Sequence, residues 1–254
     1  MAMLTGAERL IVAADFKPKF EGVEFCERGL GSVRNEVLWL ADELHDTGVY
    51  LKVNAALRAC GYVLINEIHQ RGFKVFADLK LVDIPETLST DALLLKEFAP
   101  EMLTVFGAAG TRSIKAVKDL LPDVDVLGIT ALTHLDNDDA YDLYGNTTSW
   151  GATIKLARQA REAGAGVVCA PVEAAAVREN FPGYYTIVTA GVRPAWASVK
   201  GDDQNAARVM TPAQAIKAGA SRVVLGRPIL QALNRREAVI RTIEEISNAL
   251  EAVA

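Results

Sequence analysis

A pair of charged residues interrupts one of the apolar segments of this 254-residue chain. In the sequence Phe76-Ala77-Asp78-Leu79-Lys80 a carboxylate and an ammonium group stand two residues apart. Because successive side chains of a β-strand alternate between its faces, Asp78 and Lys80 are expected to point one way and Leu79 the other. An isolated pair of this kind is often only a structural ion pair. In a ligand site, however, the ammonium group could stabilise developing negative charge and deliver a proton.

Two further charged residues stand near the ends of other apolar segments. Asp15 closes the first such segment, and Lys52 lies one residue before the end of the second. A single aspartate in such a place is often a helix cap, and a single lysine is usually a solvated surface residue. Four charges of alternating sign in one place would keep one another ionised. We therefore interpret these two residues, together with Asp78 and Lys80, as one functional cluster.

The cluster requires a fold that brings the ends of several strands together. Short apolar segments recur along the chain, with longer segments of helical spacing between them. The eight expected strands are 10–15, 49–53, 74–79, 102–106, 124–132, 166–170, 185–190 and 222–225. The expected helices include 35–44, 87–98, 113–120, 153–163 and 213–218. This alternation predicts an α/β protein, and it favours a single-domain (β/α)8 TIM barrel over residues 1–254 rather than an open sheet.

Two arginines follow the last two expected strands. Arg193 follows the seventh strand, and Arg227, preceded by Gly226, follows the eighth. In such barrels the loops after these strands commonly bind phosphate through backbone N–H groups, a short helix and charge-assisted bonds from arginine. We therefore predict a phosphate site here, with residues 229–233 as the short helix. Taken alone, either arginine could belong to a simple turn on the surface.

Composition and charge restrict the class of partner. The formal net charge of −5 argues against a broad surface for nucleic acid. Cys26, Cys60 and Cys169 are too scattered for a disulfide framework or a metal site, and the three histidines lack metal-binding spacing. Nowhere do about eighteen apolar residues run together, and the N-terminus lacks a basic region followed by an apolar stretch. We expect a cytoplasmic protein with no membrane span, no nucleic-acid partner and no bound metal.

The sequence from Asp78 to Thr87 resembles the signature D-x-K-x-x-D-I-P-x-T of the orotidine 5′-phosphate decarboxylase family. The resemblance implies cofactor-free conversion of orotidine 5′-monophosphate to UMP and CO₂ in pyrimidine biosynthesis, with Lys80 as the proton donor to a carbanion at C6. It also implies a homodimer in which Asp83 and Thr87 complete the neighbouring subunit's site. The residues that it implies for catalysis are Lys52, Asp78, Lys80 and Asp83, with Asp15 as a further member of the charged array.

The resemblance extends to both ends of the ligand and covers residues 10 to about 232. The segment 201–204 resembles a flexible phosphate-gripping loop whose glutamine, here Gln204, also reaches the base. Thr133 stands at the position whose hydroxyl and backbone read the pyrimidine amide. A threonine in a loop can also simply be satisfied by its neighbours. The implied ligand contacts are Asp15, Lys52, Thr87, Thr133, Arg193, Gln204, Gly226 and Arg227.

Two positions and one segment depart from the family pattern, and two other functions stay open. Ala190 stands where proline is usual, Phe106 stands where histidine is common, and segment 17–34 resembles an irregular insertion. The main alternative is an Mg²⁺-dependent sugar-phosphate decarboxylase or aldolase with a similar barrel, but such enzymes lack the I-P-x-T continuation and the D-Q pair. A non-catalytic barrel that binds a phosphorylated ligand would be expected to have lost part of the charged array.

Overall fold

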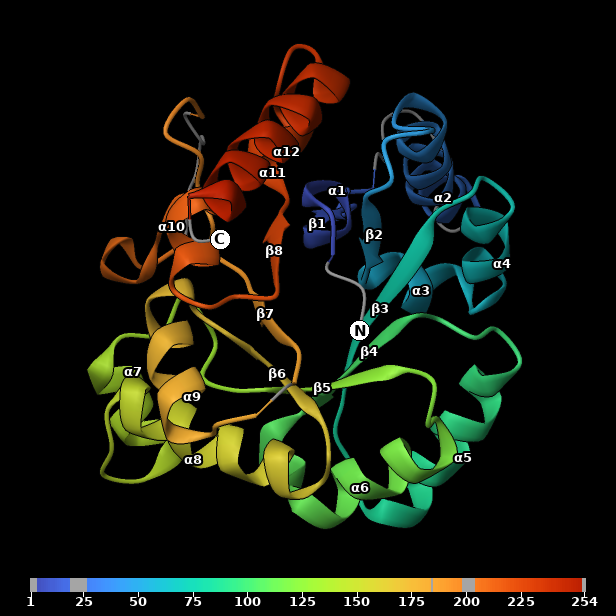
Figure 1. The fold of residues 1–254 in the computed structure, drawn as a ribbon. Helices are drawn as coiled ribbons and strands as arrows, with labels where there is room; N and C mark the ends of the chain where they lie inside the picture. Colours follow the sequence, from blue (N-terminus) through green and yellow to red (C-terminus); the bar gives the residue numbers. More distant parts are fainter. Residues whose placement is uncertain (1–3, 19–26, 184, 198–203, 253–254) are drawn as a thin grey trace.

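Eight parallel strands close into a barrel in the order β1 to β8 (Figure 1). The computed structural model describes residues 4–18, 27–183, 185–197 and 204–252. The strands are β1 (Leu10–Ala13), β2 (Tyr50–Val53), β3 (Lys74–Leu81), β4 (Met102–Phe106), β5 (Asp125–Ile129), β6 (Gly166–Cys169), β7 (Ile187–Thr189) and β8 (Arg222–Leu225). Pairing of β1 with β8 closes the ring, with Ile11 beside Val224. The predicted α/β class and (β/α)8 barrel are thereby confirmed.

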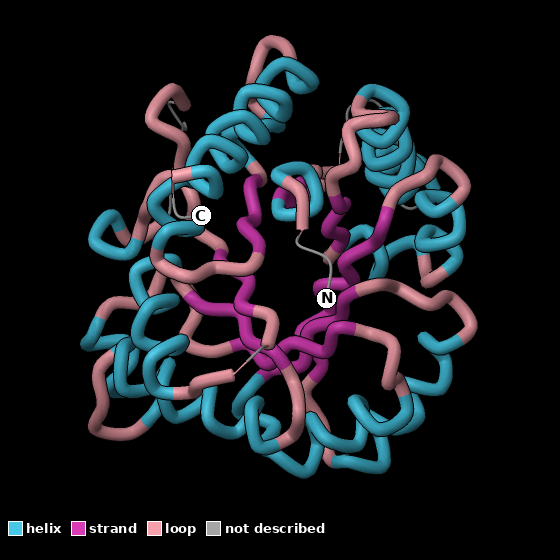
Figure 2. Tube along the Cα trace, in the orientation of Figure 1, coloured by secondary structure: helices cyan, strands magenta, loops and turns pink. Residues whose placement is uncertain are grey.

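Helices surround the ring of strands, as Figure 2 shows. The α-helices are α1 (Gly6–Arg9), α2 (Glu27–Glu43), α3 (Ala55–Cys60), α4 (Val63–His69), α5 (Pro85–Lys96), α6 (Gly110–Leu120), α7 (Asn137–Tyr144), α8 (Ser149–Glu162), α9 (Ala174–Asn180), α10 (Pro212–Lys217), α11 (Arg227–Leu230) and α12 (Arg235–Glu251). Among the described residues the short 3₁₀ turns are η1 (Gly107–Ala109), η2 (Pro171–Glu173) and η3 (Ala206–Arg208). No helix in the described ranges is long and apolar enough to cross a membrane.

The strands supply two apolar cores because their side chains alternate between the two faces of the sheet. In β1, Leu10 and Val12 belong to the large core between strands and helices, whereas Ile11 and Ala13 face the barrel interior. Tyr50, Phe76, Met102, Leu127, Val188 and Val224 complete the interior cluster. The interior is thus a packed core, and it leaves the carboxyl ends of the strands as the place for a site.

The structure corrects several of the predicted boundaries. The fifth strand ends at Ile129, so residues 130–132 belong to the following loop, and the seventh strand covers only Ile187–Thr189. The segment 17–34 is not irregular throughout, because α2 begins at Glu27. Residues 19–26 lie outside the described residues.

The early start of α2 has a tertiary cause. Its glycines disfavour a helix, but the buried residues Val33, Val37, Leu40 and Ala41 recur at helical spacing and pack onto the barrel. Burial of this apolar stripe outweighs the low local propensity.

Candidate active site

The four charged residues of the predicted cluster lie together at the carboxyl end of the barrel. The Nζ atom of Lys52 donates to Oδ2 of Asp15 at 2.9 Å and to Oδ2 of Asp78 at 3.0 Å. The Nζ atom of Lys80 donates to the same Asp78 oxygen at 2.7 Å. The charges therefore alternate from Asp15 through Lys52 and Asp78 to Lys80, as the sequence predicted.

Exposure divides this array into an inner and an outer pair. Lys52 and Asp78 are buried, whereas the side chain of Lys80 is 33% exposed and that of Asp15 is 49% exposed. The inner pair holds the array in place, and the outer pair can meet a ligand. Lys80 is thus an ammonium group that is anchored by a buried carboxylate and open on its other side.

The array depends on an irregular backbone in β3. The sheet register shifts between Ala77 and Leu81, and Lys80 has a left-handed backbone with φ +51°. Asp78 and Lys80 meet on one side of the strand, as the alternation of side chains predicted, although the backbone at Lys80 is distorted. A non-glycine residue in a strained conformation costs about 1–3 kcal/mol, and such strain tends to gather at functional sites. Leu79 packs into the outer core, as predicted.

Thr104, which the sequence analysis missed, holds this distortion in place. Its hydroxyl donates to Oδ1 of Asp78 at 2.9 Å and accepts from the backbone N–H of Lys80 at 2.8 Å. Thr104 is fully buried in β4. The available signal was a lone hydroxyl in the apolar strand Met102–Phe106. A second missed residue is Asn54, whose Nδ2 lies 3.5 Å from Oδ2 of Asp78.

The opposite charges keep the buried pair ionised. Burial by itself would raise the pKa of Asp78, but the ammonium groups of Lys52 and Lys80 outweigh it and hold this pKa well below its usual range. Burial would likewise lower the pKa of Lys52, but the carboxylates of Asp78 and Asp15 outweigh burial and raise this pKa above its usual value. Because the folded pKa of Asp78 lies below the unfolded one, its contribution to stability is fully present above the unfolded pKa. That contribution is lost only as the pH falls through the folded pKa.

A cavity of about 980 Å³ opens beside the array. A volume of this order is typical of sites that enclose a small organic ligand. Its apolar floor includes Phe76, Ile129, Val168 and Val224. The residues of the predicted site that line it are Asp15, Lys52, Asp78, Lys80, Thr133, Arg193, Gln204, Gly226 and Arg227.

The residues predicted to bind phosphate also line this cavity. Gly226 follows β8, and Arg227 begins the short helix α11. This helix covers Arg227–Leu230, so the predicted helix 229–233 starts two residues too late. Arg193 follows β7, and its backbone N–H donates to the carbonyl of Met210 at 2.9 Å. Two half-buried arginines from neighbouring loops thus share the cavity.

The loops after β5 and β7 meet at the cavity. The Oγ1 atom of Thr133 donates to Oε1 of Gln204 at 2.6 Å. Gly191 is pressed against this contact: it has φ +85°, and a Cβ atom there would lie 3.0 Å from Oε1 of Gln204. The structure thus joins the two residues that the resemblance places near the base. The preceding positions 201–203 of the expected phosphate-gripping loop lie outside the described residues.

Asp83 and Thr87 do not line this cavity. Both are exposed, and Oδ1 of Asp83 accepts a hydrogen bond from the backbone N–H of Ile84 at 2.7 Å. Asp83 borders a separate hollow of about 440 Å³ that Arg112 and Ser113 also line. The exposed side chains of Val82 and Ile84 flank Asp83. Within this chain the two polar residues therefore lie outside the cavity beside the array, and their predicted role in a neighbouring subunit stays a prediction.

The described side chains offer no ready metal centre. In the described ranges, no three His, Cys, Asp or Glu side chains group as ligands for a metal ion.

Comparison with known proteins places this array in a family. Residues 8–242 match the model of the orotidine 5′-phosphate decarboxylase / HUMPS family. The chain belongs to this family. The orotidine 5′-phosphate decarboxylase of Heliobacterium modesticaldum is 35% identical over 255 residues, which cover 96% of this chain and 97% of that protein. The orotidine 5′-phosphate decarboxylase of Vibrio cholerae is 34% identical over 222 residues, which cover 85% of this chain and 93% of that protein.

A solved structure agrees with the sequence comparisons. The crystal structure of orotidine 5′-phosphate decarboxylase from Lactobacillus acidophilus superposes with a TM-score of 0.74 at 28% identity. The match covers 94% of this chain and 99% of that one. The resemblance to the orotidine 5′-phosphate decarboxylase family that began at Asp78–Thr87 therefore holds for nearly the whole barrel.

Proposed function

We propose that the protein is an orotidine 5′-phosphate decarboxylase, a carboxy-lyase that converts orotidine 5′-monophosphate to UMP and CO₂. One observation carries the proposal: the Lys80 ammonium group stands at the cavity, anchored 2.7 Å from a buried carboxylate, in a chain that belongs to this family. The full-length relatives of that name favour this function over the Mg²⁺-dependent alternative. In this proposal residues 1–254 act as one cytoplasmic catalytic barrel without nucleic acid.

The chemistry requires an electrostatic catalyst. When the bond between C6 and the carboxylate breaks, its electron pair stays on C6 as a vinyl carbanion and CO₂ leaves. The pyrimidine ring cannot delocalise this pair, so a fixed positive charge beside C6 is the available means of stabilisation. The Lys80 ammonium group supplies that charge and then transfers one proton to C6, which gives UMP. Solvent restores the proton to Lys80.

The other residues of the array orient the Lys80 ammonium group. Asp78 receives hydrogen bonds from Lys52, Lys80 and Thr104, so its carboxylate has little freedom to turn. It would face the departing carboxylate of the substrate and hold the ammonium group against C6. Because the protein groups are already oriented and ionised, they need little reorganisation when the carbanion forms.

The two arginines and the two joined loops provide binding. In our proposal Arg193, Gly226 and Arg227 bind the phosphate, and Thr133 reads the pyrimidine amide. Gln204 contacts both ends of the nucleotide. Binding energy from a phosphate remote from C6 can be used to organise the site, so it should contribute to turnover as well as to affinity.

The assay of the activity is direct. Purified protein should convert orotidine 5′-monophosphate to UMP, with a fall in absorbance, equally fast with and without EDTA. EDTA-sensitive turnover of a sugar phosphate, and none of orotidine 5′-monophosphate by folded protein, would instead support the Mg²⁺-dependent alternative.

Replacing Thr104 with valine is expected to lower kcat about ten- to a hundredfold. The change removes the hydroxyl that fixes both Asp78 and the strained backbone of Lys80, and an unsatisfied buried polar group costs about 1–3 kcal/mol. Steady-state kinetics and a thermal melt should be measured together. Thr242→Val is the matched control, since Thr242 is equally buried and its hydroxyl donates to the carbonyl of Ala238, at 2.7 Å in α12. Equal kcat losses in the two variants would contradict a specific role for Thr104.

A shared dimeric site predicts complementation between two inactive variants. Asp83→Ala and Lys80→Ala should each have little activity as homodimers. In a mixed dimer one site loses both residues and the other keeps both, so random exchange of subunits should restore about a quarter of the sites. Activity after mixing and re-equilibration measures this directly. Persistent inactivity of verified mixed dimers would place Asp83 outside the neighbouring site.

A further inference from the structure

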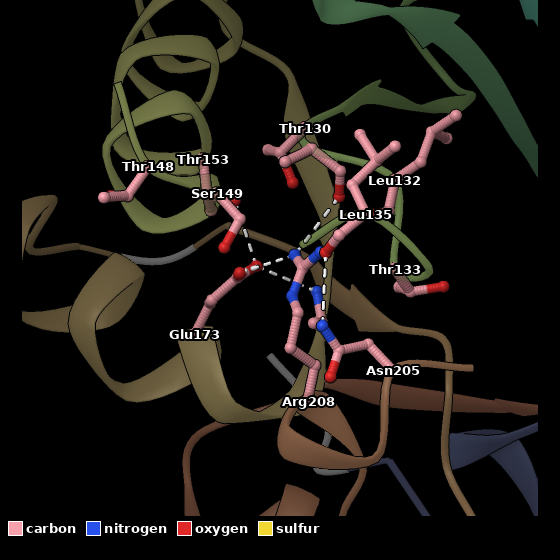
Figure 3. A network of polar contacts seen from close by, with 12 residues as sticks. Thr130, Leu132, Thr133, Leu135, Thr148, Ser149, Thr153, Glu173, Asn205 and Arg208 are labelled. Atoms are coloured by element: carbon pink, nitrogen blue, oxygen red, sulfur yellow. Dashed lines mark hydrogen bonds and ion pairs between the residues drawn. The ribbon is translucent and has the colours of Figure 1, made fainter. Parts of the chain in front are cut away.

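A buried ion pair stands next to the site but outside the charged array (Figure 3). Arg208, the last residue of η3, is 5% exposed, and Glu173, the last residue of η2, is 2% exposed. The Nη2 atom of Arg208 donates to Oε1 of Glu173 at 2.5 Å. Such a pair adds little net stability, because desolvation of both charges offsets their attraction. The role of Arg208 is therefore indicated by the other hydrogen bonds that its guanidinium group makes.

The guanidinium group of Arg208 holds the loop after β5. Its Nη1 atom donates to the carbonyl of Leu132 at 2.7 Å and to that of Leu135 at 3.1 Å. Its Nη2 atom lies 3.4 Å from the carbonyl of Ala131. In the sequence, Leu132 comes before Thr133 and Leu135 comes after it. Dashed lines in Figure 3 mark the contacts of Arg208 with the carbonyls of these two leucines. One side chain thus fixes the backbone that carries a predicted pyrimidine contact.

The same residue is tied to the segment that begins at Gln204. Asn205, which follows Gln204, caps η3 by accepting from the N–H of Ala207 at 3.1 Å. At the far end of this segment, Met210 pairs with Val192 beside β7. Arg208 lies between these two anchors, so its contacts with the β5 loop join the two loops. The loops also meet through the 2.6 Å hydrogen bond from Thr133 to Gln204, and Nδ2 of Asn205 lies 3.5 Å from the carbonyl of Leu135.

Glu173 in turn fixes the guanidinium group. Its second carboxylate oxygen, Oε2, accepts from Oγ1 of Thr153 at 3.0 Å and from the backbone N–H of Ala170 at 3.1 Å. Both oxygens of this buried carboxylate are thus engaged, on partners from α8, from the end of β6 and from η3. Nε of Arg208 is buried without a hydrogen-bond partner among the described residues, but both Nη atoms and both carboxylate oxygens are bonded, which leaves the pair few alternative arrangements.

We propose that Arg208, oriented by Glu173, is a positioning residue that sets the spacing between Thr133 and Gln204 for substrate binding. The inference rests on the proposed function, in which these two residues contact the nucleotide. Arg208 itself does not line the cavity and acts through the backbone carbonyls of Leu132 and Leu135. Because misplacement of binding groups by about 1 Å can be costly, loss of this anchor should weaken binding beyond any loss of stability.

The first experiment compares two buried arginines at opposite ends of the barrel. Arg208→Lys keeps the positive charge but cannot reach all of its partners. Arg222→Lys is the matched control: Arg222 is 6% exposed, pairs with Asp125 at 3.4 Å and donates to the carbonyl of Glu8 at 3.1 Å, at the amino ends of the strands. Both variants should have a lower Tm, but only Arg208→Lys should raise KM for orotidine 5′-monophosphate, about tenfold and with a smaller change in kcat. An equal KM change in both variants would overturn the proposal.

A double-mutant cycle then tests whether Arg208 acts through the proposed contact. Thr133→Val removes the hydroxyl that meets Gln204. In this background Arg208→Lys should raise KM less than about twofold, since coupled residues have non-additive effects. A full tenfold effect in both backgrounds would refute the positioning role. If Arg208→Lys does not fold, Glu173→Gln, which keeps the side-chain volume, takes its place in the cycle with the same expected results.

The wild-type protein in the same assay separates the two proposals. If the wild-type protein turns over orotidine 5′-monophosphate but the effects of Arg208→Lys and Thr133→Val on KM are additive, only the positioning role of Arg208 is overturned. Absence of turnover by folded wild-type protein overturns the proposed function and, with it, this inference.

Discussion

Replacing Lys80 with alanine is expected to lower kcat for decarboxylation of orotidine 5′-monophosphate by at least about 10⁴-fold. The change removes both the charge that stabilises the carbanion and the proton that quenches it. Loss of a general acid alone typically costs about 10²–10⁴-fold, and loss of one preorganised electrostatic partner costs about 10²–10³-fold. The measurement is the rate of UMP formation at saturating substrate.

The matched control for this change lies on the same strand. Lys74 begins β3 at the amino end of the barrel, where its Nζ atom contacts Glu8 at 3.4 Å. Lys74→Ala should keep the wild-type kcat. The Lys80 variant should keep the fold and still bind UMP, because Lys52 continues to pair with Asp78 at 3.0 Å. A Lys80 variant that folds, binds UMP and decarboxylates within about tenfold of the wild-type rate would exclude Lys80 as the proton donor.

Replacing Arg227 with alanine is expected to lower kcat/KM for orotidine 5′-monophosphate by about 10²–10⁴-fold. Arg227 lines the cavity after β8, where we propose that it binds the phosphate. Two charge-assisted hydrogen bonds of about 1.5–3 kcal/mol each correspond to this range. Part of the loss should fall on kcat, because remote binding energy helps to organise the reacting groups.

A substrate without phosphate makes this test specific. The nucleoside orotidine should be a far poorer substrate for the wild-type protein, and Arg227→Ala should change its slow turnover little. Arg236→Ala is a suitable control, because Arg236 contacts the backbone carbonyls of Glu43 and His45 rather than the cavity. Equal losses on the two substrates in the Arg227 variant would show that Arg227 acts on something other than the phosphate.

The alternation of apolar strands and amphipathic helices was enough to predict the barrel and the location of its site. In a parallel barrel every strand delivers its carboxyl end to the same rim, so residues at those ends meet however far apart they are in sequence. For this reason Asp15, Lys52, Asp78 and Lys80 could be grouped from their positions in the sequence alone. The same rule predicted that Arg193 and Arg227 would share a cavity.

The sequence was less informative where contacts between distant segments decide the outcome. Helix α2 forms despite its glycines, and its apolar stripe from Val33 onward is buried against the barrel. The roles of Asp83 and Thr87 stay predictions, since they depend on a second subunit. Residues 19–26 and 201–203, which include part of the expected phosphate-gripping loop, lie outside the described residues.

By itself, then, the sequence determined which residue types reach the rim, because strand periodicity and chain order are local properties. The tertiary structure decided how they are held. The left-handed backbone of Lys80 depends on Thr104, which lies 24 positions away. The spacing of Thr133 and Gln204 depends on Arg208, which is 76 positions from Leu132. These long-range hydrogen bonds form only when the packing of strands and loops brings a buried donor close to its acceptor. No local sequence pattern predicts which donor and acceptor will pair.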